Sequence, residues 1–63
     1  MKELLKDLFN SDCQAKRYLL ANYGEDVFVE CKQKGYIREE GTVWSLTPAG
    51  FNQLDRLIMQ SIN

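Results

Sequence analysis

The 63-residue chain is predicted to fold as one small α+β domain of three short helices, a β-hairpin and a closing helix. Three observations support this prediction. Hydrophobic residues make up 44% of the chain and charged residues 27%, which is typical of a globular domain and not of a disordered chain. Five breaks divide the chain into short segments, namely Asn10-Ser11, Gly24, Gly35, Gly41 and Thr47-Pro48. Helical spacing of apolar residues gives way to a β-type pattern only in the fourth segment.

The first three segments are predicted to be helices. Residues 2–9 carry leucine and phenylalanine on one side and charged residues on the other. The Ser-Asp-Cys-Gln sequence at residues 11–14 has the spacing of a capping box, so a second helix should start there and end at Gly24. The third helix, residues 25–34, has acidic residues in its first turn and lysines near its end, which complements the helix dipole; Gly35 should end it.

A β-hairpin is predicted at about residues 36–46, where aromatic and β-branched residues gather. Glu-Glu-Gly at residues 39–41 should form a three-residue loop, with the glycine at positive φ. Trp44 and Leu46 fall on one face of the second strand. With Ile37 they should pack the hairpin onto the helices.

The closing helix is predicted at about residues 48–62. Thr47 is a suitable N-cap, and Pro48 is suited to the first helical position. Gly50 should weaken the start of this helix. The five segments leave no linker, so residues 1–63 are expected to form a single domain.

Charge and apolar patterning exclude several classes of protein. Eight basic residues stand against nine acidic ones, and the net charge of −1 gives no global attraction to nucleic acid or anionic lipid. No apolar stretch reaches the roughly 18 residues that a membrane helix needs. The first residues alternate charge with leucine, unlike a signal peptide, so we expect a cytoplasmic protein that does not bind membranes.

Metal and enzyme chemistry are not expected. The chain has no histidine and no CxxC pair, so Cys13 and Cys31 are interpreted as two buried small hydrophobic residues, although a disulfide is possible in principle. It has no GxSxG motif and no glycine-rich phosphate loop, and neither cysteine has a visible base partner. We therefore predict no enzymatic activity, no metal and no cofactor.

Two short motifs resemble a known family. Lys-Gly-Tyr-Ile at residues 34–37 is similar to the "K-G-L-I" that leads from the third helix into the wing of bacterial winged-helix regulators of the MarR and PadR kind. Trp-Ser-Leu-Thr-Pro-Ala-Gly at residues 44–50 is similar to their "Y-x-L-T-x-x-G". The resemblance covers about residues 25–58. It implies a small winged helix and a DNA-binding transcriptional regulator of the bacterial or phage type.

Two functions from different classes follow from this resemblance and stay open. In the resembled family the third helix enters the major groove and the wing approaches the minor groove or a phosphate. The candidate DNA-binding residues are Lys16, Arg17, Lys32, Gln33 and Arg38. Carboxylates at the matching helix and wing positions oppose DNA binding. The alternative is a winged-helix protein-interaction module, of the phage or mobile-element type, whose candidate contact residues are Glu25, Asp26, Glu39 and Glu40. We favour DNA binding slightly, because of the fold.

The closing helix also allows two interpretations. It carries more apolar residues than one face of a small core requires. It either packs across the first helix and completes the monomer, or reaches a second copy through Leu57, Met59 and Ile62. The family resemblance favours the homodimer.

Overall fold

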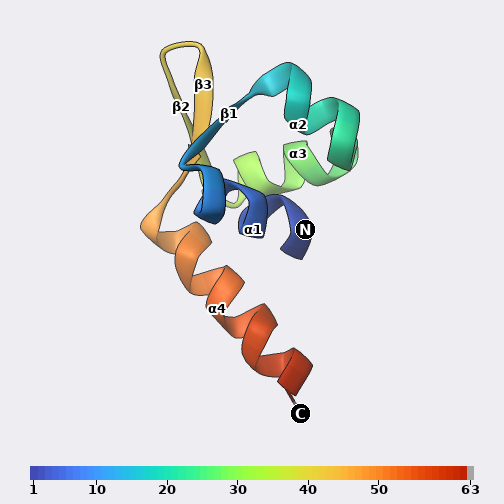
Figure 1. The fold of residues 1–63 in the computed structure, drawn as a ribbon, viewed down its shortest axis with the longest axis vertical. Helices are drawn as coiled ribbons and strands as arrows, with labels where there is room; N and C mark the ends of the chain where they lie inside the picture. The colour runs from blue at the N-terminus through green and yellow to red at the C-terminus, as the bar shows by residue number, and fades with distance from the viewer. Residues whose placement is uncertain (63) are drawn as a thin grey trace.

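The computed structural model describes residues 1–62, and the side chains of residues 1–60. Four helices and three strands follow one another along the chain (Figure 1). They are α1 (Lys2–Ser11), β1 (Cys13–Ala15), α2 (Lys16–Tyr23), α3 (Glu25–Gln33), β2 (Ile37–Glu40), β3 (Val43–Leu46) and α4 (Pro48–Ile62). This confirms the predicted α+β class, and the arrangement is compatible with the layout of a small winged helix.

The sheet has one strand more than predicted. Its three strands are antiparallel in the order β1-β3-β2, so β3 lies in the centre. Cys13 lies opposite Ser45, and Ala15 lies opposite Val43. The prediction that residues 11–14 form a capping box is therefore wrong. Asp12 takes a φ of 72°, which ends α1, and the next three residues pair with β3 before α2 begins.

The hairpin turn is tighter than the predicted three-residue loop. Glu40 lies opposite Val43, which leaves only Gly41 and Thr42 in the turn. The φ of Gly41 is 66°, and a positive φ at the first turn position alone is the pattern of a type II′ hairpin turn. Glu39 and Glu40 consequently belong to β2 and do not form the tip of the wing.

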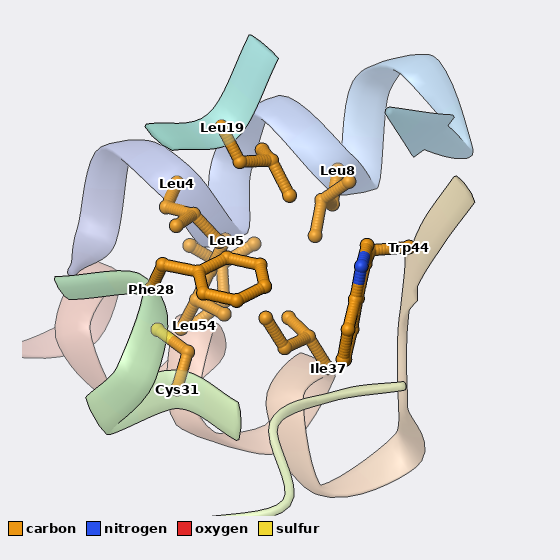
Figure 2. Close-up of a cluster of buried hydrophobic side chains, with 9 residues drawn as sticks. All are labelled: Leu4, Leu5, Leu8, Leu19, Phe28, Cys31, Ile37, Trp44 and Leu54. Carbon is orange, nitrogen blue, oxygen red and sulfur yellow. The ribbon is translucent and has the colours of Figure 1, made fainter. Parts of the chain in front are cut away.

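The core lies where α1, α2, α3, the hairpin and the start of α4 meet (Figure 2). Its buried residues are Leu4, Leu5, Leu8, Leu19, Phe28, Cys31, Ile37, Trp44 and Leu54. Phe28 meets Trp44 edge to face, with ring centroids 5.0 Å apart. The buried positions of Ile37 and Trp44 confirm that the hairpin packs onto the helices.

The two cysteines lie in different surroundings. Cys31 is fully buried on α3, as predicted, whereas Cys13 is exposed, so the prediction is wrong for that residue. The reason is that Cys13 pairs with Ser45, and successive residues of a strand point to opposite faces, so Cys13 lies on the face that Trp44 does not use. Both thiols are free.

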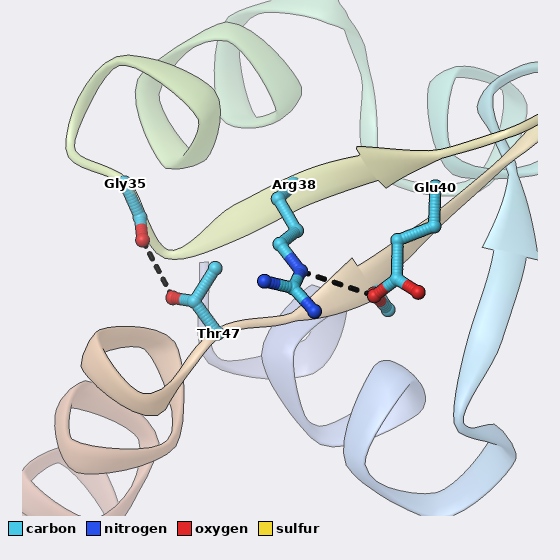
Figure 3. Close-up of polar contacts among 5 residues, drawn as sticks. Gly35, Arg38, Glu40 and Thr47 are labelled. Carbon is cyan, nitrogen blue, oxygen red and sulfur yellow. Dashed lines mark hydrogen bonds and ion pairs between the residues drawn. The ribbon is translucent and has the colours of Figure 1, made fainter.

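The start of α4 is fixed by contacts to the segment before β2. The Gly50 amide donates to Thr47 Oγ1 at 3.0 Å, which confirms the predicted N-cap. Thr47 Oγ1 itself donates to the carbonyl oxygen of Gly35 at 2.6 Å (Figure 3). From this anchor α4 passes α1 and extends away from the rest of the molecule (Figure 1). No helix within residues 1–62 is both long and apolar enough to cross a membrane.

Candidate nucleic-acid interface

The N-terminus of α2 carries exposed basic side chains. Its first two residues are Lys16 and Arg17, both exposed, and its first turn contains no acidic residue. Ala15 occupies the N-cap and offers no side-chain hydrogen bond to the helix. Free amides and the helix dipole already make a helix N-terminus attractive to anions, and two basic side chains add to that field. Within the chain, no acidic side chain of the first turn compensates the dipole at this helix start.

Contacts across the fold place this helix start beside the β2–β3 hairpin and α3. Ala15 pairs with Val43, and Val43 pairs with Glu40 on its other side, so the start of α2 lies level with the outer part of the hairpin. Lys16 Nζ lies 5.8 Å from the ring centroid of Phe28 on α3, within cation–π range. The start of α2 thus lies beside the β2–β3 hairpin, and the Lys16 side chain lies against α3.

The other candidate DNA-binding residues differ in whether their side chains are free or already paired. Lys32 and Gln33 are exposed in the last turn of α3. Arg38 on β2 is occupied, because its Nε donates to Glu40 Oε1 at 3.0 Å (Figure 3). Ser45 Oγ donates to the same oxygen, and these two hydrogen bonds, with that from Ser45 the larger influence, lower the pKa of Glu40. The charge of Arg38 is therefore partly balanced within the β2–β3 hairpin.

The acidic candidates are also at the surface. Glu25 and Asp26 are exposed in the first turn of α3, where they complement the helix dipole. Glu39 is exposed on β2. Glu30, also on the exposed part of α3, is paired with Lys34 at 3.3 Å. α3 therefore carries three exposed carboxylates against one exposed lysine, whereas the first turn of α2 carries two exposed basic residues and no acidic one.

Comparison with known proteins gives no relative from which to assign a role. No protein-family model, curated protein or solved structure matches the chain. The resemblance to MarR- and PadR-type regulators stays an expectation from the two motifs. No group of three or more metal-ligating side chains comes together in the described part of the chain.

A hydrogen-bonded cluster around Asp7 was not foreseen from the sequence. The Asp7 carboxylate accepts hydrogen bonds from the hydroxyls of Tyr18, at 2.8 Å, and Tyr23, at 2.5 Å. It also accepts from Ser11 Oγ and from Gln14 Nε2, at 2.8 and 3.1 Å. The donors come from α1, β1 and α2, so one carboxylate links three elements. The spacing of the tyrosines gave no sign that they converge on α1.

These hydrogen bonds change how the cluster titrates. They lower the pKa of Asp7 from 3.8 to about 2, with the bond from Tyr23 as the largest cause and desolvation acting in the opposite direction. The same bond raises the pKa of Tyr23 above its ordinary value of 10.0. Because the folded chain favours the charged form of Asp7, this carboxylate stabilises the fold above pH 4, and that stabilisation disappears as the pH falls from about 4 to 2.

We expect Asp7→Asn to lower the free energy of unfolding at pH 7 by on the order of 1–2 kcal/mol, because the amide is a weaker acceptor for two tyrosine hydroxyls. Urea unfolding at pH 7, 4 and 2.5, followed by circular dichroism, measures this. Below pH 4 the free energy of unfolding should also fall less in the variant than in the wild type. Glu3→Gln, an exposed change on the same helix, is the control and should keep the full decline. An unchanged decline in Asp7→Asn would contradict the assignment.

A second surface lies between α1 and α4, away from the basic helix start. Phe9 and Phe51 are 51% and 48% exposed, and their ring centroids lie 5.6 Å apart. They border a groove of about 250 Å³ whose lining residues are Lys6, Phe9, Asn10, Phe51, Leu54, Asp55 and Ile58.

The three residues predicted for dimerisation differ in their surroundings. Leu57 is half-buried and packs against the core, whereas Met59 is 59% exposed. The side chain of Ile62 lies outside the described residues. The apolar surface thus centres on Phe9, Phe51 and Ile58, which the sequence did not single out for this role.

Proposed function

We propose that the protein is a small DNA-binding regulator that contacts DNA through the start of α2, the exposed end of α3 and the wing. The observation that carries the proposal is the start of α2, where Lys16 and Arg17 stand at an N-terminus without a side-chain cap or an acidic neighbour in the first turn. Phosphate contacts in protein–DNA complexes are made by such backbone amides and by basic side chains. A DNA-binding role is consistent with the cytoplasmic location expected from the sequence.

The positions of the other residues support this role. Lys32 and Gln33 add one charge and one amide on α3, and Arg38 lies on the wing strand. In helix-turn-helix proteins the helix before the recognition helix crosses the DNA backbone, which is the position that α2 would take. The motif resemblance to MarR- and PadR-type regulators is a separate line of support for the same role.

The acidic residues on α3 and β2 set the expected strength of binding. Each carboxylate facing a phosphate opposes association and slows it. Three contacts, from Lys16, Arg17 and Lys32, predict a slope of log K against log salt of about −2.7, at about −0.9 per contact. We therefore expect weak binding that is strongest at low salt.

Fluorescence anisotropy with mixed duplexes across a salt series tests the proposal. Arg17→Ala should weaken binding uniformly across sequences and reduce the magnitude of the salt slope by about 0.9, because one phosphate contact is lost. Arg56→Ala removes an equal charge from an exposed position on α4 and should leave both quantities unchanged. The proposal would be contradicted if no binding were found at 20 mM salt, which is about one-seventh of physiological ionic strength. Equal effects of the two variants would also contradict it.

The acidic surface favours a second candidate, a protein-interaction module that binds through Glu25, Asp26, Glu39 and Glu40. All four side chains are exposed, although Glu40 is engaged by Arg38 and Ser45. Neutralising Glu25 and Asp26 together separates the two roles. DNA binding should become tighter when the carboxylates are removed, whereas a protein partner that recognises them should be lost.

A further inference from the structure

The α1–α4 groove has apolar side chains along it and one charge on each wall. Phe9 and Phe51 are about half exposed, and Ile58 is also exposed. Lys6 comes from α1 and Asp55 from α4, and both are exposed. Lys6 and Asp55 form no ion pair with each other or with another side chain described in residues 1–60. The groove therefore presents one unpaired positive and one unpaired negative charge.

Helix α4, which forms one wall of the groove, also carries a ridge of mainly apolar side chains suited to fill the same groove of another molecule. Phe51, Asp55 and Ile58 recur at positions i, i+4 and i+7 of α4 and so share one side of the helix. Met59, at the edge of this side, is the most exposed large apolar residue described. Figure 1 shows that the later part of α4 extends beyond the rest of the fold, and the side chains of Phe51, Ile58 and Met59 are all exposed.

A two-fold interface requires a surface that complements itself, since each contact from the first copy to the second is repeated from the second to the first. A groove with an apolar floor, a lysine on one wall and an aspartate on the other meets this requirement. A partner of uniformly acidic or basic character would match only one of the two charges. We propose that the α1–α4 groove binds α4 of a second copy of this chain, with Lys6 of each copy paired to Asp55 of the other.

The proposed dimer is compatible with DNA binding but does not depend on it. The wing and the free end of α4 lie at opposite ends of the molecule (Figure 1). The start of α2 lies level with the wing, so pairing through α4 leaves it accessible. The dimer can therefore be tested without DNA, and its failure would leave the salt-dependent DNA titration unaffected.

A charge exchange between copies tests the specific contact. Sedimentation equilibrium of the full chain measures the dimer dissociation constant. Lys6→Glu and Asp55→Lys should each weaken the homodimer roughly tenfold or more, because each places two like-charge pairs across the interface. Mixing the two variants should restore dimers to within a few-fold of wild type, because both pairs then have opposite charges. Attraction within one chain cannot produce this recovery.

Arg56→Glu is the matched control, a charge reversal on α4 at a residue that does not line the groove. It should leave the dissociation constant unchanged, while Met59→Glu should weaken the dimer because it charges the apolar ridge. Circular dichroism of each variant confirms that the fold is retained. A wild-type chain that stays monomeric at millimolar concentration would overturn the proposal. Weakening by either charge variant without recovery in the mixture would overturn the Lys6–Asp55 pairing.

Discussion

Gly50→Ala should destabilise the protein by roughly 2–3 kcal/mol, although alanine in a helix is ordinarily about 1 kcal/mol more favourable than glycine. A Cβ at this position would lie 2.1 Å from the carbonyl oxygen of Tyr36 and 2.8 Å from Leu46 Cδ1. The backbone oxygen cannot rotate away, so α4 would have to move from the hairpin. Thermal and urea unfolding followed by circular dichroism measure the change.

Asn52→Ala, two residues further along α4, is the control. Asn52 is exposed, and alanine there should leave stability unchanged or raise it slightly because of its higher helix propensity. A stabilising effect of Gly50→Ala similar to that of Asn52→Ala would mean that α4 does not approach Tyr36 as described. The opposite signs expected for the two variants make the pair a sensitive test of where α4 begins.

The same close approach shows where reasoning from local sequence reaches its limit. Helix propensity correctly identifies Gly50 as a poor helix residue. It gives no information on a carbonyl group fourteen residues earlier in the chain. The Thr47 cap was predictable because its hydrogen bond to the Gly50 amide is local. Its second bond, to the Gly35 carbonyl, was not, because it depends on how the hairpin folds back.

The strand β1 was missed for a related reason. Ser-Asp-Cys-Gln at residues 11–14 has a helix-start spacing, and three residues are too few to show an alternating pattern. Pairing with β3 decides the outcome, and that partner lies about thirty residues later. The Ser11 and Gln14 side chains do meet, at 3.0 Å, but they surround Asp7 and do not cap α2.

The candidate interface was predicted only in part. Lys16 and Arg17 were singled out because they are basic and lie on the second helix. Their position at the first turn of α2 follows from the extra strand, which shifts the helix start to Lys16. Arg38 was predictable as a wing residue, whereas its pairing with Glu40 depends on both residues lying on the same side of β2. Charge can be counted from the sequence, but the partner that balances it depends on the fold.

Trp44→Ala should have the largest effect on stability of any single change considered. Trp44 is only 7% exposed, lies in the central strand and packs against Phe28 and the other core residues (Figure 2). Truncation of a buried aromatic residue costs about 3–5 kcal/mol. At roughly 0.05–0.15 kcal/mol per residue, a chain of this length has only about 3–9 kcal/mol of stability in total. We therefore expect much of the variant to be unfolded at 25 °C, with loss of the helical circular dichroism signal.

Two further variants make this result quantitative. Trp44→Phe keeps an aromatic ring against Phe28 and should remain folded, with an unfolding midpoint between those of the wild type and the alanine variant. Val43→Ala changes the neighbouring residue, which lies on the opposite face of the same strand and is half-buried, and should cost only about 1 kcal/mol. Equal losses in Trp44→Ala and Val43→Ala would contradict the position of the core on the Trp44 face. A smaller loss for Val43→Ala would support it, because the two variants differ chiefly in the face of β3 that they alter.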